Sequence, residues 1–84
     1  MKARIKEIEK LLEKMDELKD EIFQEMQELL ELRNEKFDER SEKWQESEKG
    51  EEFQEKTDEM ESLFEEFESS ISDAIRETEI FSEL

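Results

Sequence analysis

The sequence predicts an all-α protein in which two long helices form an antiparallel, coiled-coil-like hairpin, and three observations support this fold class. Proline is absent and glycine occurs once, whereas the strong helix formers Glu, Lys, Leu and Met are abundant. Apolar residues recur at helical spacing in both halves of the chain. One short stretch near the middle interrupts that spacing and offers the only credible chain reversal. The 84 residues suffice for one small domain, residues 1–84.

The first helix is expected from about residue 3 to about residue 38. Ile8, Met15, Ile22 and Leu29 recur there every seven residues. Further apolar residues, three or four positions on, widen this pattern into a stripe broader than a strict coiled-coil seam. These additional residues are Ile5, Leu11, Leu12, Leu18, Met26 and Leu32.

The turn segment is expected over about residues 39–50. Ser41 and Ser47 are each followed by Glu-Lys, and a serine N-cap with glutamate in the first turn is typical of a helix start. Gly50 either relieves the bend or lies just past the end of the first helix. Trp44 is either an anchor for a partner or a bulky plug that closes the core of the hairpin. We favour the plug, because a tight reversal needs one.

The second helix is expected over about residues 48–82. Its seam residues step by 4-3-4-3 without a fault over four heptads. High net charge with low hydrophobicity is also the signature of disorder, but a disordered tail would not keep such a register, so we expect disorder only at the chain ends. The seam is Phe53, Thr57, Met60, Phe64, Phe67, Ile71, Ala74, Thr78 and Phe81.

Charge indicates that the two helices run in opposite directions. Residues 1–14 carry five Lys/Arg against three Glu, and cations are unfavourable at the positive end of a helix dipole. Folding the chain back places this basic end beside the acidic last turns of the second helix, which relieves the mismatch. A single long helix would leave it unrelieved.

Two helices alone bury one seam, which is marginal at this chain length. We therefore expect either a homodimer that forms a four-helix bundle or a different protein that covers the surplus apolar surface. The sequence leaves the packing direction of such a dimer open. The residues predicted to form the core or the oligomer interface are Ile8, Leu11, Met15, Leu18, Ile22, Leu29, Phe53, Met60, Phe64, Phe67, Ile71 and Phe81.

Composition argues against an enzyme. Cysteine and histidine are absent, so thiol nucleophiles, imidazole bases and the usual zinc ligands are missing, and we expect no cofactor. Paired carboxylates such as Glu65-Glu66 lie on a solvated helix face, whereas a catalytic carboxylate needs a dry pocket. No run of about 20 apolar residues exists for a membrane span, nor an apolar signal sequence, so we expect a cytoplasmic protein.

The acidic charge is the better functional lead. The formal charge of −16 excludes direct binding of nucleic acid or anionic membranes by bulk attraction. Residues 51–84 carry thirteen Asp/Glu against two Lys/Arg, about one acidic group per 4 Å of helix, compared with one phosphate per about 1.7 Å of duplex DNA. A dimer would approach the density of DNA, so the helix could bind a basic surface on another protein; alternatively, the charge only keeps the chain soluble. The predicted binding residues are Glu51, Glu55, Asp58, Glu59, Glu65, Glu66, Glu68 and Asp73.

The segment "FDERSEKWQESEKGEEFQEKTDEMES", residues 37–62, resembles short acidic helical-hairpin proteins of phages and prophages of Gram-positive bacteria. In that pattern an aromatic-Asp pair precedes a Pro-Glu-x-Leu-Gln turn, then Ser-Glu-Arg/Lys-Gly and an acidic amphipathic helix. Ser41 stands here in place of the proline and Trp44 in place of the leucine. The matching positions are Phe37-Asp38, Glu42, Gln45, Ser47-Glu48-Lys49-Gly50 and Asp58.

The resemblance implies a helical hairpin and a phage origin, hence the cytoplasm of a bacterial host, but no reaction and no functional residues. With the acidic helix, it leads us to expect a phage-type inhibitor that mimics nucleic acid on a basic host protein. The alternative is a self-assembling coiled-coil scaffold, natural or designed.

Overall fold

The computed structural model describes residues 1–84 and contains three helices and no strand. These are α1 (Lys2–Asp38), the single-turn α2 (Glu42–Gln45) and α3 (Glu48–Glu83). The all-α prediction is therefore confirmed. The expected bounds of the two long helices, 3–38 and 48–82, differ from these by one residue at one end of each.

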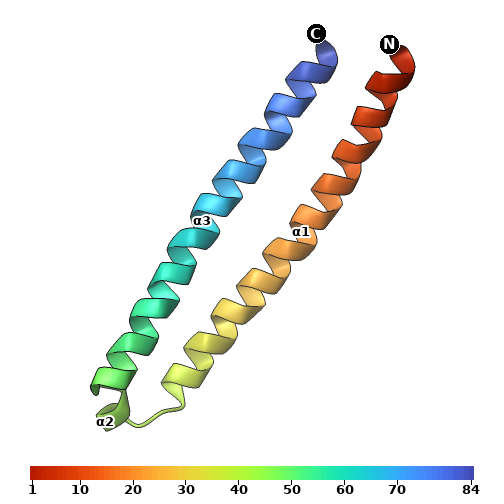
Figure 1. The fold of residues 1–84 in the computed structure, drawn as a ribbon. Coiled ribbons are helices and arrows are strands. Elements are labelled where there is room, and N and C mark those ends of the chain that lie inside the picture. Colours follow the sequence, from red (N-terminus) through yellow and green to blue (C-terminus); the bar gives the residue numbers. More distant parts are fainter.

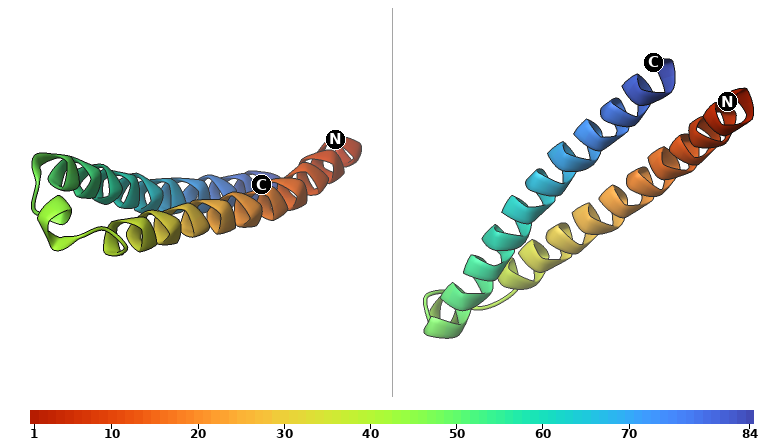
Figure 2. Two further views of the ribbon diagram at one scale, coloured as in Figure 1. Left: turned by 90° about the horizontal axis from the view of Figure 1, so that it is seen from below. Right: turned by 45° about the horizontal axis from the view of Figure 1, so that its top comes forward.

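The two long helices lie side by side and run in opposite directions, with α2 at one end and both chain termini at the other (Figures 1 and 2). The molecule is a rod with extents of 64 × 16 × 11 Å. Facing residues have numbers that add up to 90, as in the contacting pairs Arg33–Thr57, Phe37–Phe53 and Phe23–Phe67. This relation gives the position of any residue of α1 along the long axis of the rod, which we call its height, relative to the residues of α3.

Serine side chains start both helices that follow the first. Ser41 Oγ accepts a hydrogen bond from the amide of Trp44 at 3.3 Å, and Ser47 Oγ accepts one from the amide of Gly50 at 3.3 Å. Both serines have extended backbone angles, as N-cap residues do. Two residues predicted as helix starts thus cap α2 and α3, which places the reversal between Asp38 and Glu48. By contrast, α1 has no side-chain cap and no acidic residue in its first turn.

The layer between the helices is thin. Leu30, at 9% exposed, is the only hydrophobic side chain that is buried. The other inward residues of α1 are half-buried and follow steps of three and four, which places them on one helix face. The inward residues of α1 are Ile8, Leu12, Met15, Lys19, Phe23, Met26, Leu30, Arg33 and Phe37.

Some of the residues predicted as core or oligomer interface are exposed in the single chain. Those that are half-buried between the helices are Ile8, Met15, Phe53, Met60, Phe64, Phe67 and Ile71. Those that are exposed are Leu11, Leu18, Ile22, Leu29 and Phe81. The inward residues of α1 take two successive steps of four, from Met15 to Lys19 to Phe23, where a strict seven-residue repeat would take a four and a three. From this point on α1 turns Phe23 and Leu30 toward α3, and not Ile22 and Leu29.

No helix combines the length and the apolar character needed to span a lipid bilayer.

Candidate functional site

The turn end of the molecule is closed by three aromatic rings. Trp44 packs edge-on against Phe37 and Phe53 with ring centroids 6.1 and 6.0 Å apart, and the Phe37 and Phe53 rings stack at 6.3 Å. Two guanidinium groups cover the cluster: Arg33 lies 4.0 Å from the Phe53 ring and Arg40 lies 4.2 Å from the Trp44 ring. Trp44 therefore packs as the plug of the core, and the sequence analysis missed the two arginines that stack on this cluster.

Gly50 makes the close approach of α2 and α3 possible. A Cβ at this position would lie 2.5 Å from the carbonyl oxygen of Gln45 and closer still to that of Trp44. Its φ angle is not positive, so the requirement is for space and not for a left-handed conformation. The only glycine of the chain thus stands where α2 folds back against the first turn of α3.

A polar layer interrupts the apolar contacts one heptad above the turn. Arg33 Nε donates to Thr57 Oγ1 at 2.9 Å, and Arg33 Nη2 donates to the carbonyl oxygen of Phe53 at 3.2 Å. Thr57 is 2% exposed, and its hydroxyl in turn donates to the same carbonyl at 3.1 Å. Thr57 belonged to the predicted seam, but its partner did not. Arg33 stands three residues after Leu30 and four before Phe37, and this spacing could have placed it on the inward face of α1.

We expect Thr57→Val to destabilise the protein by about 1–3 kcal/mol, because the change keeps the shape but leaves a guanidinium N–H of Arg33 without its acceptor. Urea unfolding followed by circular dichroism, at fixed protein concentration, measures the effect. Thr78→Val is the matched control, since the Thr78 hydroxyl donates only to the Ala74 carbonyl of its own helix, at 2.8 Å. Equal losses in both variants would contradict a role for the Arg33–Thr57 pair.

Lys19 is a cation in an inward position. Its ammonium lies 2.7 Å from Asp16, 3.4 Å from Asp20 and 5.9 Å from the centre of the Phe23 ring. The hydrogen bond to Asp16 is the main reason that the pKa of Lys19 is raised above its ordinary value of 10.5. Since the folded state favours the charged lysine, this contribution to stability is complete below pH 10.5 and is lost as the pH rises through the higher pKa of the folded state.

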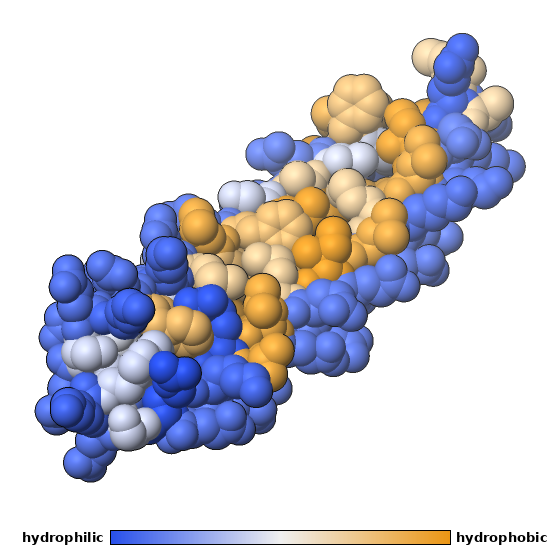
Figure 3. Space-filling view, turned by 60° about the horizontal axis from the view of Figure 1, so that its bottom comes forward, coloured by the Kyte–Doolittle hydropathy of each residue, from blue (hydrophilic) through white to orange (hydrophobic).

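An apolar stripe of six exposed side chains runs along one side of the helix pair (Figure 3). It consists of Leu11, Leu18, Ile22, Leu29, Leu32 and Leu63, which are 45–57% exposed. Each of them directly precedes an inward residue, and one residue is about 100° of helix rotation, so all six lie on the same side. We call this side of the helix pair the apolar side.

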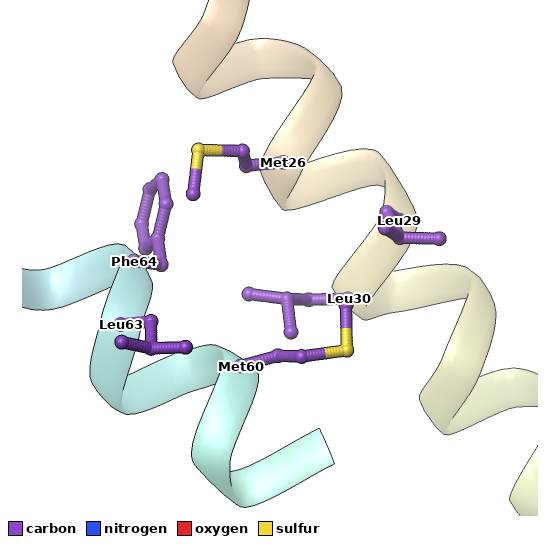
Figure 4. Close-up of a pocket in the computed structure, with 6 residues that line it drawn as sticks. All are labelled: Met26, Leu29, Leu30, Met60, Leu63 and Phe64. Atoms are coloured by element: carbon purple, nitrogen blue, oxygen red, sulfur yellow. The ribbon is translucent and has the colours of Figure 1, made fainter. Parts of the chain in front are cut away.

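Two shallow grooves open on the apolar side. The first, of about 200 Å³, is lined by Met26, Leu29, Leu30, Met60, Leu63 and Phe64. Figure 4 shows that three of these residues come from each long helix, and that Leu29 stands apart from the other five. The second groove lies toward the termini and is lined by Leu11, Lys14, Met15, Leu18, Lys19, Ile22, Phe67 and Ile71.

The opposite side of the helix pair is polar. Its groove is lined mostly by acidic and amide side chains, and only Leu30 and Phe64 are apolar there. The polar lining residues are Gln27, Glu31, Asn34, Glu61, Glu65 and Glu68. The two sides of the rod therefore offer different chemistry.

The eight carboxylates predicted to bind a partner are exposed on α3, and we call them the acidic surface: Glu51, Glu55, Asp58, Glu59, Glu65, Glu66, Glu68 and Asp73. One of them, Asp73, forms an ion pair, an exposed one with Arg76 at 3.7 Å. The other seven carry negative charge with no cation within ion-pair distance. No three acidic side chains converge closely enough to hold a metal ion.

Comparison with protein-family models, with curated proteins and with solved structures finds no match for this chain. The resemblance of residues 37–62 to phage and prophage proteins therefore stays a prediction.

Proposed function

We propose that this protein is a non-enzymatic binding module that presents the acidic surface of α3 to a basic surface on another protein. The observation that carries the proposal is the uncompensated charge: seven of the eight carboxylates have no cationic partner. A surface of this kind attracts a cluster of Lys and Arg over a distance of about one Debye length, roughly 8–10 Å at physiological salt.

The partner class that fits this surface is a protein that binds nucleic acid. Its groove is built for a regular series of negative charges, and exposed carboxylates on a straight helix supply such a series. The protein would then act as an inhibitor of a nucleic-acid-processing or defence enzyme in the bacterial cytoplasm, as its resemblance to phage proteins implies. The working form in this proposal is an antiparallel helical hairpin that dimerises into a four-helix bundle.

The second candidate function is a structural scaffold without nucleic-acid mimicry. The apolar stripe favours it, because hydrophobic side chains about half exposed along a rod are typical of self-associating helices. In a scaffold the acidic surface would only keep the assembly soluble.

A pair of charge-matched variants separates the two functions. In the first variant Glu51, Glu55, Glu65 and Glu66 of the acidic surface become Gln, and in the control variant Glu9, Glu13, Glu17 and Glu28 of α1 become Gln. Both variants lose four negative charges, so they differ only in the helix from which those charges are removed. Each immobilised protein is used to capture proteins from a lysate of a Gram-positive bacterium, with elution by salt and by duplex DNA.

We expect the unaltered protein and the α1 variant to capture nucleic-acid-binding proteins, and the α3 variant to lose them. Elution should occur between about 50 and 200 mM salt or with duplex DNA, because the contacts are electrostatic and DNA competes for the same groove. Capture that withstands both eluents, or that both variants retain equally, would argue against mimicry and for the scaffold.

A further inference from the structure

The rod as a whole exposes more surface than a compact chain of its mass, and six of its exposed hydrophobic side chains gather on the apolar side. A compact monomer of this mass exposes about 5,400 Å², whereas this chain exposes 7175 Å². The excess, roughly 1,800 Å², exceeds the ~800 Å² that each partner contributes to a stable interface. A second copy is the simplest occupant, because two identical apolar stripes complement each other about a twofold axis.

Two twofold dimers can bring the apolar sides together. An axis parallel to the helices places both turns at the same end, so that α1 of one copy lies beside α3 of the other. An axis perpendicular to the helices places the turns at opposite ends, so that α1 lies beside α1 and α3 beside α3. The charges that flank the stripe distinguish these arrangements.

Most of the charged residues that flank the stripe on α3 are acidic, and four of them lie at heptad spacing. Glu52, Glu59, Glu66 and Asp73 each directly precede an inward residue, so they lie on the apolar side. With the turns at opposite ends and the helices fully overlapped, Glu66 meets the same residue of the other copy, and Glu59 meets Asp73. This arrangement brings like charges together in the part of α3 between Glu59 and Asp73, whereas Glu52 meets Ile80.

Two lysines that flank the stripe on α1 complement acidic residues on α3. Lys36 and Glu52 lie within about two residues, or about 3 Å, of the same height, because the residues that follow them, Phe37 and Phe53, stack on each other at 6.3 Å. Lys14, which lines the second groove, lies about three residues, or about 4.5 Å, from the height of Asp73, which is within the reach of a lysine side chain. A twofold axis parallel to the helices preserves these heights.

Of the remaining acids on the edge of α3, Glu59 lies between the heights of Leu29 and Leu32 and meets aliphatic side chains of the other copy. Glu66 lies between the heights of Ile22 and Glu25, so one like-charge contact per copy remains, against two attractive lysine contacts per copy. Lys36 and Asp73 are free to form new ion pairs, since those within their own helices are exposed and long, at 3.8 and 3.7 Å.

We propose that two copies associate through their apolar sides with both turns at the same end, so that Lys14 and Lys36 of one copy face Asp73 and Glu52 of the other. The inference rests on the dimer named in the proposed function, and it does not require a partner to bind the acidic surface, of which it places Asp73 at the dimer interface. It specifies which helices become neighbours and in what register.

Spin-label distances in the full chain test the arrangement, and the absence of cysteine makes single labelling clean. A label on Lys43→Cys, in the exposed α2, should give an interchain distance of about 20–30 Å, because neighbouring helix axes lie about 10 Å apart. A label on Ser69→Cys, near mid-length, is the control and should give a short distance in either arrangement. A Lys43→Cys distance approaching the 64 Å length of the molecule would overturn the proposal. So would sedimentation equilibrium that shows only a monomer.

A charge swap tests the register. Lys14→Glu should raise the dimer dissociation constant about two- to twentyfold, because the twofold dimer contains this exposed pair twice and each pair contributes up to about fivefold. Lys14→Glu combined with Asp73→Lys should restore the affinity. Failure of the second change to restore affinity would overturn the proposed pairing. Neither experiment requires a basic partner, so loss of the inhibitor function would leave its outcome unchanged.

Discussion

Gly50→Ala is expected to lower the stability of this protein by about 1–3 kcal/mol, although alanine is the better helix former. Helix propensity alone predicts a gain of up to about 1 kcal/mol in α3. The new methyl group would instead lie 2.5 Å from the Gln45 carbonyl oxygen and nearer still to that of Trp44, and both are backbone atoms that cannot rotate away. The sign of the effect therefore separates packing from propensity.

The measurement is thermal unfolding followed by circular dichroism. For a domain of this size, 1 kcal/mol corresponds to a shift of about 4–8 °C in Tm. Ser69→Ala in α3 is the control, because it increases helix propensity at an exposed position and should change Tm little or raise it. A Gly50→Ala protein as stable as the original would mean that α2 does not pack against α3 as described.

The seam of α3 could be predicted from the sequence because a single 4-3 pattern runs through it. Phe53, Phe64, Phe67 and Ile71 were expected at the inter-helix seam or an oligomer interface, and they lie half-buried against α1. The caps were equally readable, since a serine followed by Glu-Lys has few other uses than to start a helix.

The seam of α1 could not be predicted from the sequence because two apolar stripes run one residue apart. Ile22 and Phe23, or Leu29 and Leu30, are equally apolar, and spacing alone does not decide which of each pair faces α3. The inward face also holds Arg33, which looks like a break in an apolar pattern until its hydrogen bond to Thr57 is seen. For the acidic surface, exposure follows from charge, but recognition depends on a partner outside the chain.

Phe53→Ala is expected to cost about 3 kcal/mol, the lower end of the range for buried phenylalanine, because Phe53 is half-buried. The ring stacks on Phe37 and meets the edge of Trp44, so its loss opens the turn end of the core. It also removes the face on which the guanidinium of Arg33 lies at 4.0 Å, which leaves that cation less well held beside Thr57. Urea unfolding at fixed protein concentration measures the loss.

Trp44 offers a second readout for the same change. As the only tryptophan it reports on this cluster alone, and opening the cluster to water should shift its emission to longer wavelength before the helices unfold. Phe81→Ala is the matched control, because Phe81 is 68% exposed at the terminal end and its removal leaves no cavity. If both substitutions cost the same and neither moved the Trp44 emission, the aromatic cluster would not be what holds the two long helices together at the turn.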